Sequence, residues 1–339
     1  MEYRYEAGFT KSQPTASDVH VNTPLTNISI AFIQNATNFV ADRVFPNIPV
    51  AKQSDRYYTY DRGYFNRDEM EVRAPGTESA GSGYEVDSTP TYYADVYAFH
   101  HDVPDQVRAN ADSVIRPDRD GTELVTHKAL IKREALWASK YFGTGIWGTE
   151  RAGVAAGPTG TQFLRWDDAN STPIEDMRAA VTAVLESTGF MMNTLVIDQY
   201  TFDALIDHPD IVDRVKYGQT APGVAMVDVA ELQQLFKIPR IFVMRSIRNT
   251  AKEGAANAHS FIGGKNALLC YSAPNPGLQV PTAGYTFSWN GLLGSGASGQ
   301  RITRFRMEHL KSDRIEVEMS FDQKLVSDEL GYFFQDTVS

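Results

Sequence analysis

The sequence predicts an α+β fold, because helices and strands alternate in its middle while strands alone fill its last part. The residue pattern predicts an amphipathic helix over residues 122–142, alternating helices and short apolar strands over 170–275, and mainly strands after residue 284. Such partial segregation is typical of α+β proteins. At 339 residues, with 42% hydrophobic and 22% charged side chains, the chain has the composition of a folded protein.

The charge balance and the single cysteine argue against several classes of function. The formal net charge is −10 and there is no long basic run, which disfavours a protein that binds nucleic acid across a broad basic surface but not one that encloses it. Cys270 lies in an apolar run, so we expect a buried, inert thiol. No secretion signal and no apolar stretch of membrane-spanning length occurs, which favours synthesis in the cytoplasm.

The chain begins with a polar segment followed by an apolar one. Residues 1–24 contain Pro14 and Pro24 among Ser and Thr, a composition typical of an arm that is ordered only against a partner. Apolar residues then recur from Ile28 to Val40 at helix-like spacing, so we expect this part to pack on the body of the fold.

The next segment, residues 51–104, contains no Leu and no Ile but eight of the sixteen tyrosines. Two extended runs, near residues 50–61 and 91–103, flank a loop of about thirty residues, which predicts a long hairpin. The hairpin is either exposed, with tyrosines packed across its strands, or packed on another chain. Tyr and Arg are enriched in the cores of protein interfaces, which makes the second alternative worth testing.

A capping box formed by Asp120 and Glu123 predicts the start of a long helix, and Gly143 predicts its end. At 1.5 Å per residue this helix would be about 30 Å long. Its apolar side chains cover two adjacent stripes: Leu124, Ile131, Ala135, Ala138 and Phe142 on one, and Leu130, Trp137 and Tyr141 on the other.

A second capping box, with Thr172 as the cap and Pro173 at the first helical position, predicts a helix that ends at Gly189. After it, the sequence predicts a buried strand at 193–198, a helix at 200–208, a helix at 227–238, and strands near 240–247 and 266–273. Alternating strands follow over YTFSW, RITRFRME and RIEVEMSFDQKLV.

Four short motifs resemble ligand sites but lack what each site requires. Gly294–Gly299 matches the dinucleotide pattern, yet a strand pattern follows where a helix is needed. Gly263–Asn266 lacks the earlier glycine and the Ser or Thr of a P-loop, and Asp118–Gly121 lacks the first and last calcium ligands of an EF-hand. His100 and His101 are adjacent on a strand and therefore point to opposite faces. We expect no catalytic residue, no cofactor and no metal.

The order of these segments resembles the major capsid protein of tailed bacteriophages, whose fold is the Hong Kong 97 type. The resemblance is carried by NISIAFIQNATNFVADRVFPNIPVAKQSDRYYTYDR, RAPGTES, WDDANSTPIEDMRAAV with TGFMMNTLVID, and FIGGKNALLCYSAP before GYTFSWNG. These stretches span residues from about 25 to 310. The resemblance implies a structural protein, not an enzyme, that self-assembles into the icosahedral shell enclosing phage double-stranded DNA.

The resemblance also implies a division of the chain. The expected parts are an N-terminal arm and entry segment (1–48), an extended loop formed by the long hairpin (49–104), a peripheral domain with a spine helix (105–169), an α/β axial domain (170–275), and strands that return to the peripheral domain (276–339).

In this family the extended loop lies across a neighbouring subunit, so its tyrosines and arginines are the expected intersubunit interface: Arg56, Tyr57, Tyr58, Tyr60, Arg62, Tyr64, Arg67, Arg73, Tyr92, Tyr93 and Tyr97. Expected partners are further copies in pentamers and hexamers, a separate scaffolding protein, a portal and decoration proteins, without sequence-specific DNA binding or a membrane. The expected location is the virion, after assembly in the host cytoplasm. The alternatives are an encapsulin-like nanocompartment shell, another virion protein, and a cofactor-binding α/β enzyme.

Overall fold

The computed structural model describes residues 33–112, 115–218, 227–277, 279–293 and 299–339. The predicted arm, the apolar residues Ile28 to Phe32 and the glycines Gly294 and Gly296 lie outside the described residues. The described chain divides into two compact units, one that includes residues 98–129 and 301–318, and one of residues 34–97, 130–300 and 319–339. We call these the small and the large unit and describe each by itself.

A six-stranded mixed sheet forms the centre of the large unit. Its order is β10-β9-β13-β17-β7-β8, with β9 parallel to β10, β17 parallel to β7, and β13 antiparallel to both of its neighbours. The strands span Thr149–Val154 (β7), Gln162–Leu164 (β8), Thr194–Asp198 (β9), Arg240–Met244 (β10), Ala267–Cys270 (β13) and Gly331–Gln335 (β17).

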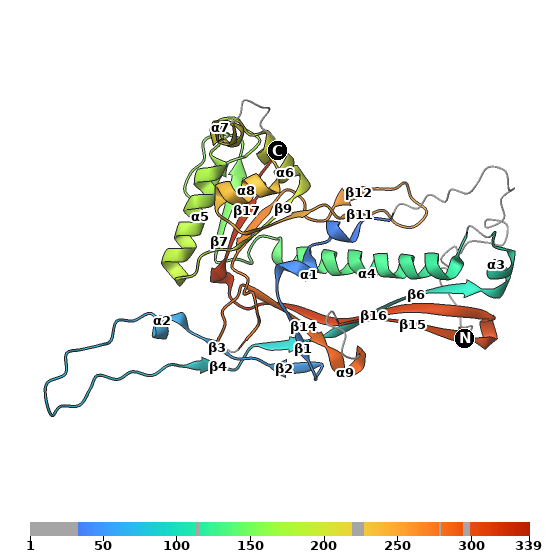
Figure 1. The fold of residues 1–339 in the computed structure, drawn as a ribbon, viewed down its shortest axis with the longest axis horizontal. Coiled ribbons are helices and arrows are strands. Elements are labelled where there is room, and N and C mark those ends of the chain that lie inside the picture. The colour runs from blue at the N-terminus through green and yellow to red at the C-terminus, as the bar shows by residue number, and fades with distance from the viewer. Residues whose placement is uncertain (1–32, 113–114, 219–226, 278, 294–298) are drawn as a thin grey trace, which may run out of the picture. The chain divides into compact units, whose positions relative to one another are not determined.

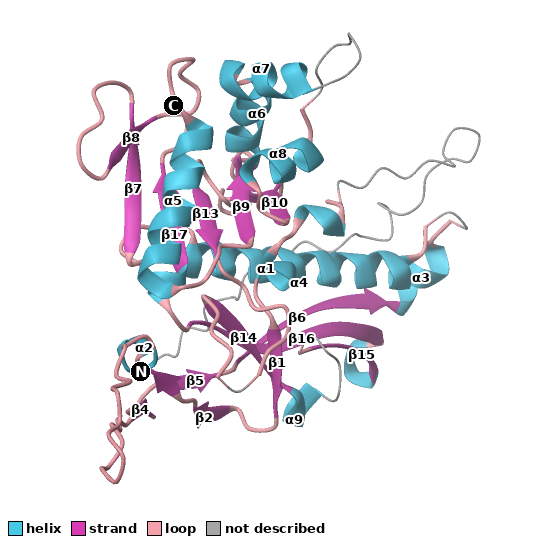
Figure 2. Ribbon diagram, turned by 60° about the vertical axis from the view of Figure 1, so that its left-hand side comes forward, coloured by secondary structure: helices cyan, strands magenta, loops and turns pink. Residues whose placement is uncertain are grey.

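Four helices cover one face of this sheet, and α5 runs across it in Figure 2. They span Pro173–Thr188 (α5), Gln199–Asp207 (α6), Pro209–Gly218 (α7) and Val229–Phe236 (α8). Because side chains alternate along a strand, Leu195, Ile197 and Leu269 point to this face and pack with Ile174 and Met177 of α5. This cluster is the larger part of the core.

The opposite face of the same sheet packs against a second apolar cluster. Val196, Leu268 and Phe333 point to it and meet the last turns of α4 (Pro117–Tyr141), where Trp137 and Tyr141 are fully buried. The segment at residues 40–45 joins this cluster, including the single turn α1 (Ala41–Val44) after the 3-10 turn η1 (Ala36–Asn38). The prediction that this segment packs on the body of the fold is confirmed for its described residues, although they do not form one continuous helix.

A second sheet of the large unit receives the base of the hairpin. β1 (Asn47–Val50) is parallel to β14 (Gly284–Trp289), which is antiparallel to the second half of β16 (Ser312–Leu325). The hairpin contains two short antiparallel pairs, β2 (Ser54–Arg56) with β5 (Thr91–Tyr93), and β3 (Thr59–Tyr60) with β4 (Val86–Asp87). The remaining pair is β11 (Ile247–Asn249) with β12 (His259–Phe261), and α9 spans Asn290–Leu293.

The small unit contains α3 (Asp105–Asn110), the first turns of α4, and a hairpin made by β15 (Gln300–Met307) and the first half of β16. The 3-10 turn η2 (Glu308–Leu310) connects these two strands. β6 (Asp95–Pro104) pairs with β16, and η3 (Asp328–Leu330) precedes β17 in the large unit. Helices and strands are mixed as predicted, so the α+β class is confirmed.

Two predicted side-chain caps, by Asp120 and by Thr172, were wrong. The long helix begins at Pro117, since proline is favoured at the first helical position. Asp120 therefore lies inside the first turn of the helix and does not cap it. Leu124 is 37% exposed and is not part of the buried stripe. The predicted start of α5, with Thr172 at the N-cap and Pro173 at the first helical position, is confirmed, although the Thr172 side chain makes no capping hydrogen bond. The predicted end at Gly189, with φ of 78°, is also confirmed.

Candidate intersubunit interface

Aromatic side chains hold the base of the hairpin to its own chain. The ring of Tyr92 stacks on that of Phe287 with 4.6 Å between centroids, and Tyr57 packs on the same ring at 5.5 Å. Tyr285 and the partly buried Ile48 complete this cluster. Burial raises the pKa of both Tyr57 and Tyr92, with nearby carboxylates adding to the effect. Although the hairpin has no Leu or Ile, its base is therefore packed through tyrosines against aromatic side chains of β14.

Tyr97 is also held within the chain. Its ring packs on Phe321 at 5.5 Å between centroids, and the Lys132 ammonium lies 5.2 Å from the ring centroid. Burial raises its pKa, and Asp95 adds to the effect. Tyr57, Tyr92 and Tyr97 thus pack on aromatic rings of β14 and β16 of their own chain, and Tyr92 is only 6% exposed.

A second, exposed aromatic group lies farther along the hairpin. Tyr60, Phe65 and Tyr84 meet in a triangle with 5.7 to 6.1 Å between ring centroids. The one-turn helix α2 (Arg62–Phe65) supplies Phe65, and Asp61 caps this turn by accepting from the Gly63 N–H. Phe65 is 57% exposed and Tyr84 is 60% exposed, so this group has apolar surface to offer a partner.

Beyond α2 the chain returns to β4 with no intervening helix or strand (Figure 1). Every side chain from Glu69 to Glu85 is exposed, and Met70 and Val72 expose nearly all of their surface, 94% and 102%. Two large apolar side chains without cover would be costly to keep in water, and such surface is typical of a binding segment.

The predicted arginines differ in what they contact. Arg62 forms an ion pair with Glu329 at 2.7 Å, Arg67 lies over the Tyr64 ring at 5.2 Å, and Arg73 donates to the Thr77 carbonyl in a local turn. Arg56 is exposed, as are Tyr58 (66%) and Tyr93 (54%).

Of the predicted residues, those outside the base cluster remain on or near the surface. Sequence reasoning did not include Phe65, Met70, Val72 and Tyr84 among the interface candidates, although all four lie in the same hairpin. The alternation of acidic and apolar residues in Asp68-Glu69-Met70-Glu71-Val72 was the available signal for the two aliphatic ones.

The hairpin is acidic. Residues 51–97 carry five basic and nine acidic side chains, a net charge of −4. The pKa of Asp55 is lowered by the backbone N–H of Arg56 and by Lys52, and the pKa of Asp87 is lowered by hydrogen bonds from Thr89. Both carboxylates are therefore ionised at neutral pH, and a basic partner surface would complement this part of the chain.

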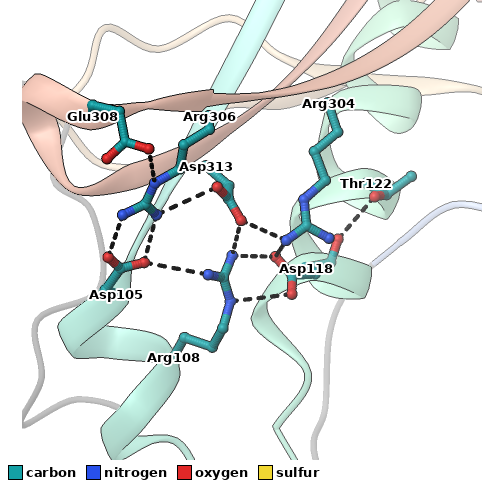
Figure 3. A network of polar contacts seen from close by, with 8 residues as sticks. All are labelled: Asp105, Arg108, Asp118, Thr122, Arg304, Arg306, Glu308 and Asp313. Atoms are coloured by element: carbon teal, nitrogen blue, oxygen red, sulfur yellow. Dashed lines mark hydrogen bonds and ion pairs between the residues drawn. The ribbon is translucent and has the colours of Figure 1, made fainter.

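In the small unit, arginines and carboxylates form a continuous network (Figure 3). Arg108 of α3 contacts Asp118 of α4 at 2.7 Å and Asp313 of β16 at 2.8 Å. Arg306 of β15 forms a bidentate pair with Asp105, at 2.7 and 2.6 Å. The side chains drawn are Asp105, Arg108, Asp118, Thr122, Arg304, Arg306, Glu308 and Asp313.

The network lowers the pKa of two of its carboxyls, those of Asp105 and Asp313. Hydrogen bonds from Arg304, Arg306 and Arg108 hold the pKa of Asp313 at about 2, and Arg306 lowers the pKa of Asp105. Asp105 and Asp313 are therefore ionised throughout the neutral range. It fastens β15 to both helices of the small unit by paired charges with directed geometry.

The buried Ser171 and His208 side chains, which could in principle act as a nucleophile and a base, are hydrogen-bonded in a way that does not suit catalysis. Ser171 Oγ lies 3.0 Å from His208 Nε2, and both residues are buried. The Asp210 N–H donates to His208 Nδ1, so the ring proton is on Nε2 and is donated to Ser171 and to the Asp168 carbonyl. A nitrogen that donates to the serine cannot accept its proton, so this pair is not a nucleophile and its base.

The remaining motifs also have local structural explanations. Cys270 is fully buried, and burial raises its pKa to about 12, so the thiolate is suppressed. The strand β15 follows Gly299, Gly263–Asn266 lies between β12 and β13, and Asp118 belongs to the small-unit network. The described His, Cys, Asp and Glu side chains form no group that could hold a metal ion. Of the helices in the described parts of the chain, none has the length and apolar character that a membrane crossing requires.

Comparisons with known proteins point in one direction. Residues 162–283 match the family described as "Phage major capsid protein E". The major capsid protein of Pseudomonas phage JBD67 is 28% identical over 94% of this chain and 97% of that protein. A crystal structure of a phage-related protein from Bordetella bronchiseptica has a TM-score of 0.66 at 20% identity, covering 90% of this chain and 93% of that one. The capsid of cyanophage P-SCSP1u has a TM-score of 0.59 at 12% identity, covering 97% and 99%.

These findings confirm two predictions. The resemblance to phage major capsid proteins extends over nearly the whole chain. The structural likeness, at these identities, is a likeness of fold, and it confirms the predicted Hong Kong 97-type capsid fold.

Proposed function

We propose that this chain, which resembles phage major capsid proteins over nearly its whole length, is the structural subunit of an icosahedral head shell that encloses phage double-stranded DNA. The observation that carries the proposal is the match with a curated major capsid protein along almost the full length of both chains. The described residues support a structural role, since the buried Ser171–His208 pair and Cys270 are arranged for packing. We therefore infer that the chain is not an enzyme.

In this proposal the segments have the roles implied by the resemblance. Residues 49–104 are the extended loop, 105–169 the peripheral domain with α4 as its spine, 170–275 the axial domain, and 276–339 the return strands. Support comes from the packing of α5 on β9 in one apolar cluster, most of whose residues lie within 170–275; Phe163, Trp166, Tyr332 and Phe334 join it from neighbouring parts of the chain.

The intersubunit interface is proposed to lie on the exposed part of the hairpin. Tyr58, Tyr60, Tyr64, Arg67 and Arg73 are exposed or half-buried there. Arg56 and Tyr93 lie nearer the base, Arg62 lies in α2, and all three are also accessible. Tyr57, Tyr92 and Tyr97 instead anchor the hairpin to its own chain, so their role in the interface is indirect.

The partners follow from this assembly. Copies of the chain would form pentamers and hexamers that close into a shell, because identical subunits close by symmetry. A separate scaffolding protein, a portal and decoration proteins are expected, with assembly in the host cytoplasm before the virion is released. The net charge of −10 would let packaged DNA move instead of adhering to the shell.

Negative-stain electron microscopy of the purified protein, with light-scattering mass, tests the proposal. Closed shells, rings or tubes of the expected mass are the expected result. A uniform monomer or dimer that persists across salt and protein concentration, with scaffolding supplied, contradicts it. An encapsulin-like shell has the same fold, and the contents of native particles separate the two, since DNA supports a virion and an enzyme cargo supports a nanocompartment.

A further inference from the structure

Strand β15 ends the second sheet and has side chains suited to an additional strand. Among the described strands it pairs with β16 alone and is last in the order β1-β14-β16-β15. It contains three arginines and no acidic residue. Its large apolar side chains Ile302 and Phe305 are 43% and 45% exposed, although Ile and Phe are among the residue types most often buried in folded proteins. An exposed edge of this kind is a ready template for pairing with another chain.

The Arg304 side chain on this strand can form further hydrogen bonds. It uses Nη2 in the small-unit network, at 2.5 Å from Asp313 and 3.3 Å from Asp118, and half of the side chain is exposed. A guanidinium has five N–H donors, so a further carboxylate can bind without breaking the network.

The long hairpin of residues 51–104 contains a segment that is acidic where β15 is basic. Asp68–Val72 has three acidic residues and no basic one, and its Met70 and Val72 are the most exposed large apolar side chains among the described residues. The segment belongs to no helix or strand. In an extended conformation, Glu69 and Glu71 lie on one face, and Met70 and Val72 lie on the other.

We propose that Asp68–Val72 of one copy adds as a strand to the open edge of β15 of a second copy. This inference rests on the proposed function and specifies the surface that receives the hairpin. Charge complementarity selects a second copy as the occupant, because Glu69 and Glu71 can meet Arg304 and Arg306, whose side chains remain 51% and 35% exposed beside their pairs in the small-unit network. Strand addition also supplies backbone hydrogen-bond partners to a segment that has no regular structure of its own.

One register satisfies both faces. With Met70 opposite Phe305, Glu69 and Glu71 lie opposite Arg304 and Arg306, whichever way the added strand runs. Met70 and Phe305 then share one face of the sheet, and Glu69, Glu71, Arg304 and Arg306 share the other, while Asp68 and Arg301 lie on the first face. A shift by one residue would place Met70 opposite an arginine and would reverse every pairing.

Disulfide trapping tests this contact. The double variant M70C/F305C is assembled into shells and oxidised, and its denaturing gels without reductant are expected to show a ladder of covalent multimers. Cys270 is fully buried and does not interfere. The variants M70C, F305C and M70C/L310C are the controls, because Leu310 is 52% exposed but lies beyond the strand.

The outcomes separate the inference from the proposed function. If shells form but give no ladder, an intrachain disulfide, or no more ladder than M70C/L310C, the docking is wrong while the capsid assignment stands. If the unmodified protein forms no shells, the capsid assignment fails first. Should the double variant not fold, hydrogen exchange of unmodified protein decides: amides of 68–72 and 300–307 are expected to gain protection on assembly, and unchanged exchange of either segment overturns the inference.

Discussion

A buried carboxylate in the large unit gives the sharpest thermodynamic prediction. Glu134 of α4 accepts hydrogen bonds from the backbone N–H groups of Val40 and Ala41, at 2.8 to 3.0 Å, and from Ser246 Oγ at 3.3 Å. It is fully buried, and burial raises its pKa from an ordinary value of 4.5 to about 7 in spite of these donors. Glu134 therefore holds Val40 and Ala41, which lie in the segment before β1, against α4.

The sign of the pH effect follows from proton linkage. Between pH 4.5 and 7 the folded chain holds a proton on Glu134 that the unfolded chain has released, so folding stability falls as pH rises across this window. Above pH 7 both states are ionised and the effect is constant. The shift corresponds to about 3 kcal/mol of unfolding free energy, at about 1.4 kcal/mol per pKa unit.

The perturbation is Glu134→Gln, which cannot ionise. Urea denaturation of both proteins in the same assembly state, at pH 4.5, 6 and 7.5, can be followed by tryptophan fluorescence, to which Trp137 on the same helix contributes. Relative to the variant, the unmodified protein is expected to lose about 3 kcal/mol between pH 4.5 and 7.5. Other titrating groups, such as Asp198, whose pKa burial raises to about 6, cancel in this difference. A difference that is constant within about 0.5 kcal/mol would mean that the donors keep Glu134 ionised throughout, and would refute the reasoning.

Three further predictions concern packing and cross-linking. Gly331→Ala is expected to destabilise the protein by several kcal/mol (about 3 or more), because a Cβ there would lie 1.9 Å from the Trp147 ring; a melting temperature within about 2 °C of the parent would contradict this. Tyr92→Leu is expected to cost about 1 kcal/mol or more through loss of the ring stack, while Tyr93→Leu, at 54% exposure, should change urea stability by less than about 0.5 kcal/mol; equal effects would contradict the anchoring role. Denaturing gels of mature unmodified shells are expected to show no ladder of covalently linked subunits. An isopeptide cross-link through the hairpin would need a lysine side chain, and the only lysine of the hairpin, Lys52, lies at its base; a ladder would contradict this.

The sequence was sufficient for the class of fold and for most elements of the large unit. Apolar periodicity locates α5, β9 and α6 because burial of one face against a core imposes that period on the side chains. The buried Cys270 followed from its apolar neighbours in the same way. The resemblance to capsid proteins was also available before any coordinates, because it depends on the order of such segments along the chain.

The partners of individual side chains required the tertiary structure. Tyr92 and Tyr93 are adjacent and identical, yet one is buried against Phe287, nearly two hundred positions away, and the other is exposed. Likewise, the carboxyl that holds Val40 and Ala41 comes from Glu134, and three arginines of the small unit converge on Asp313 from two elements. Periodicity reports only that a residue has a buried face. Which distant residue meets that face depends on how strands and helices are paired in space, and local sequence does not encode that pairing.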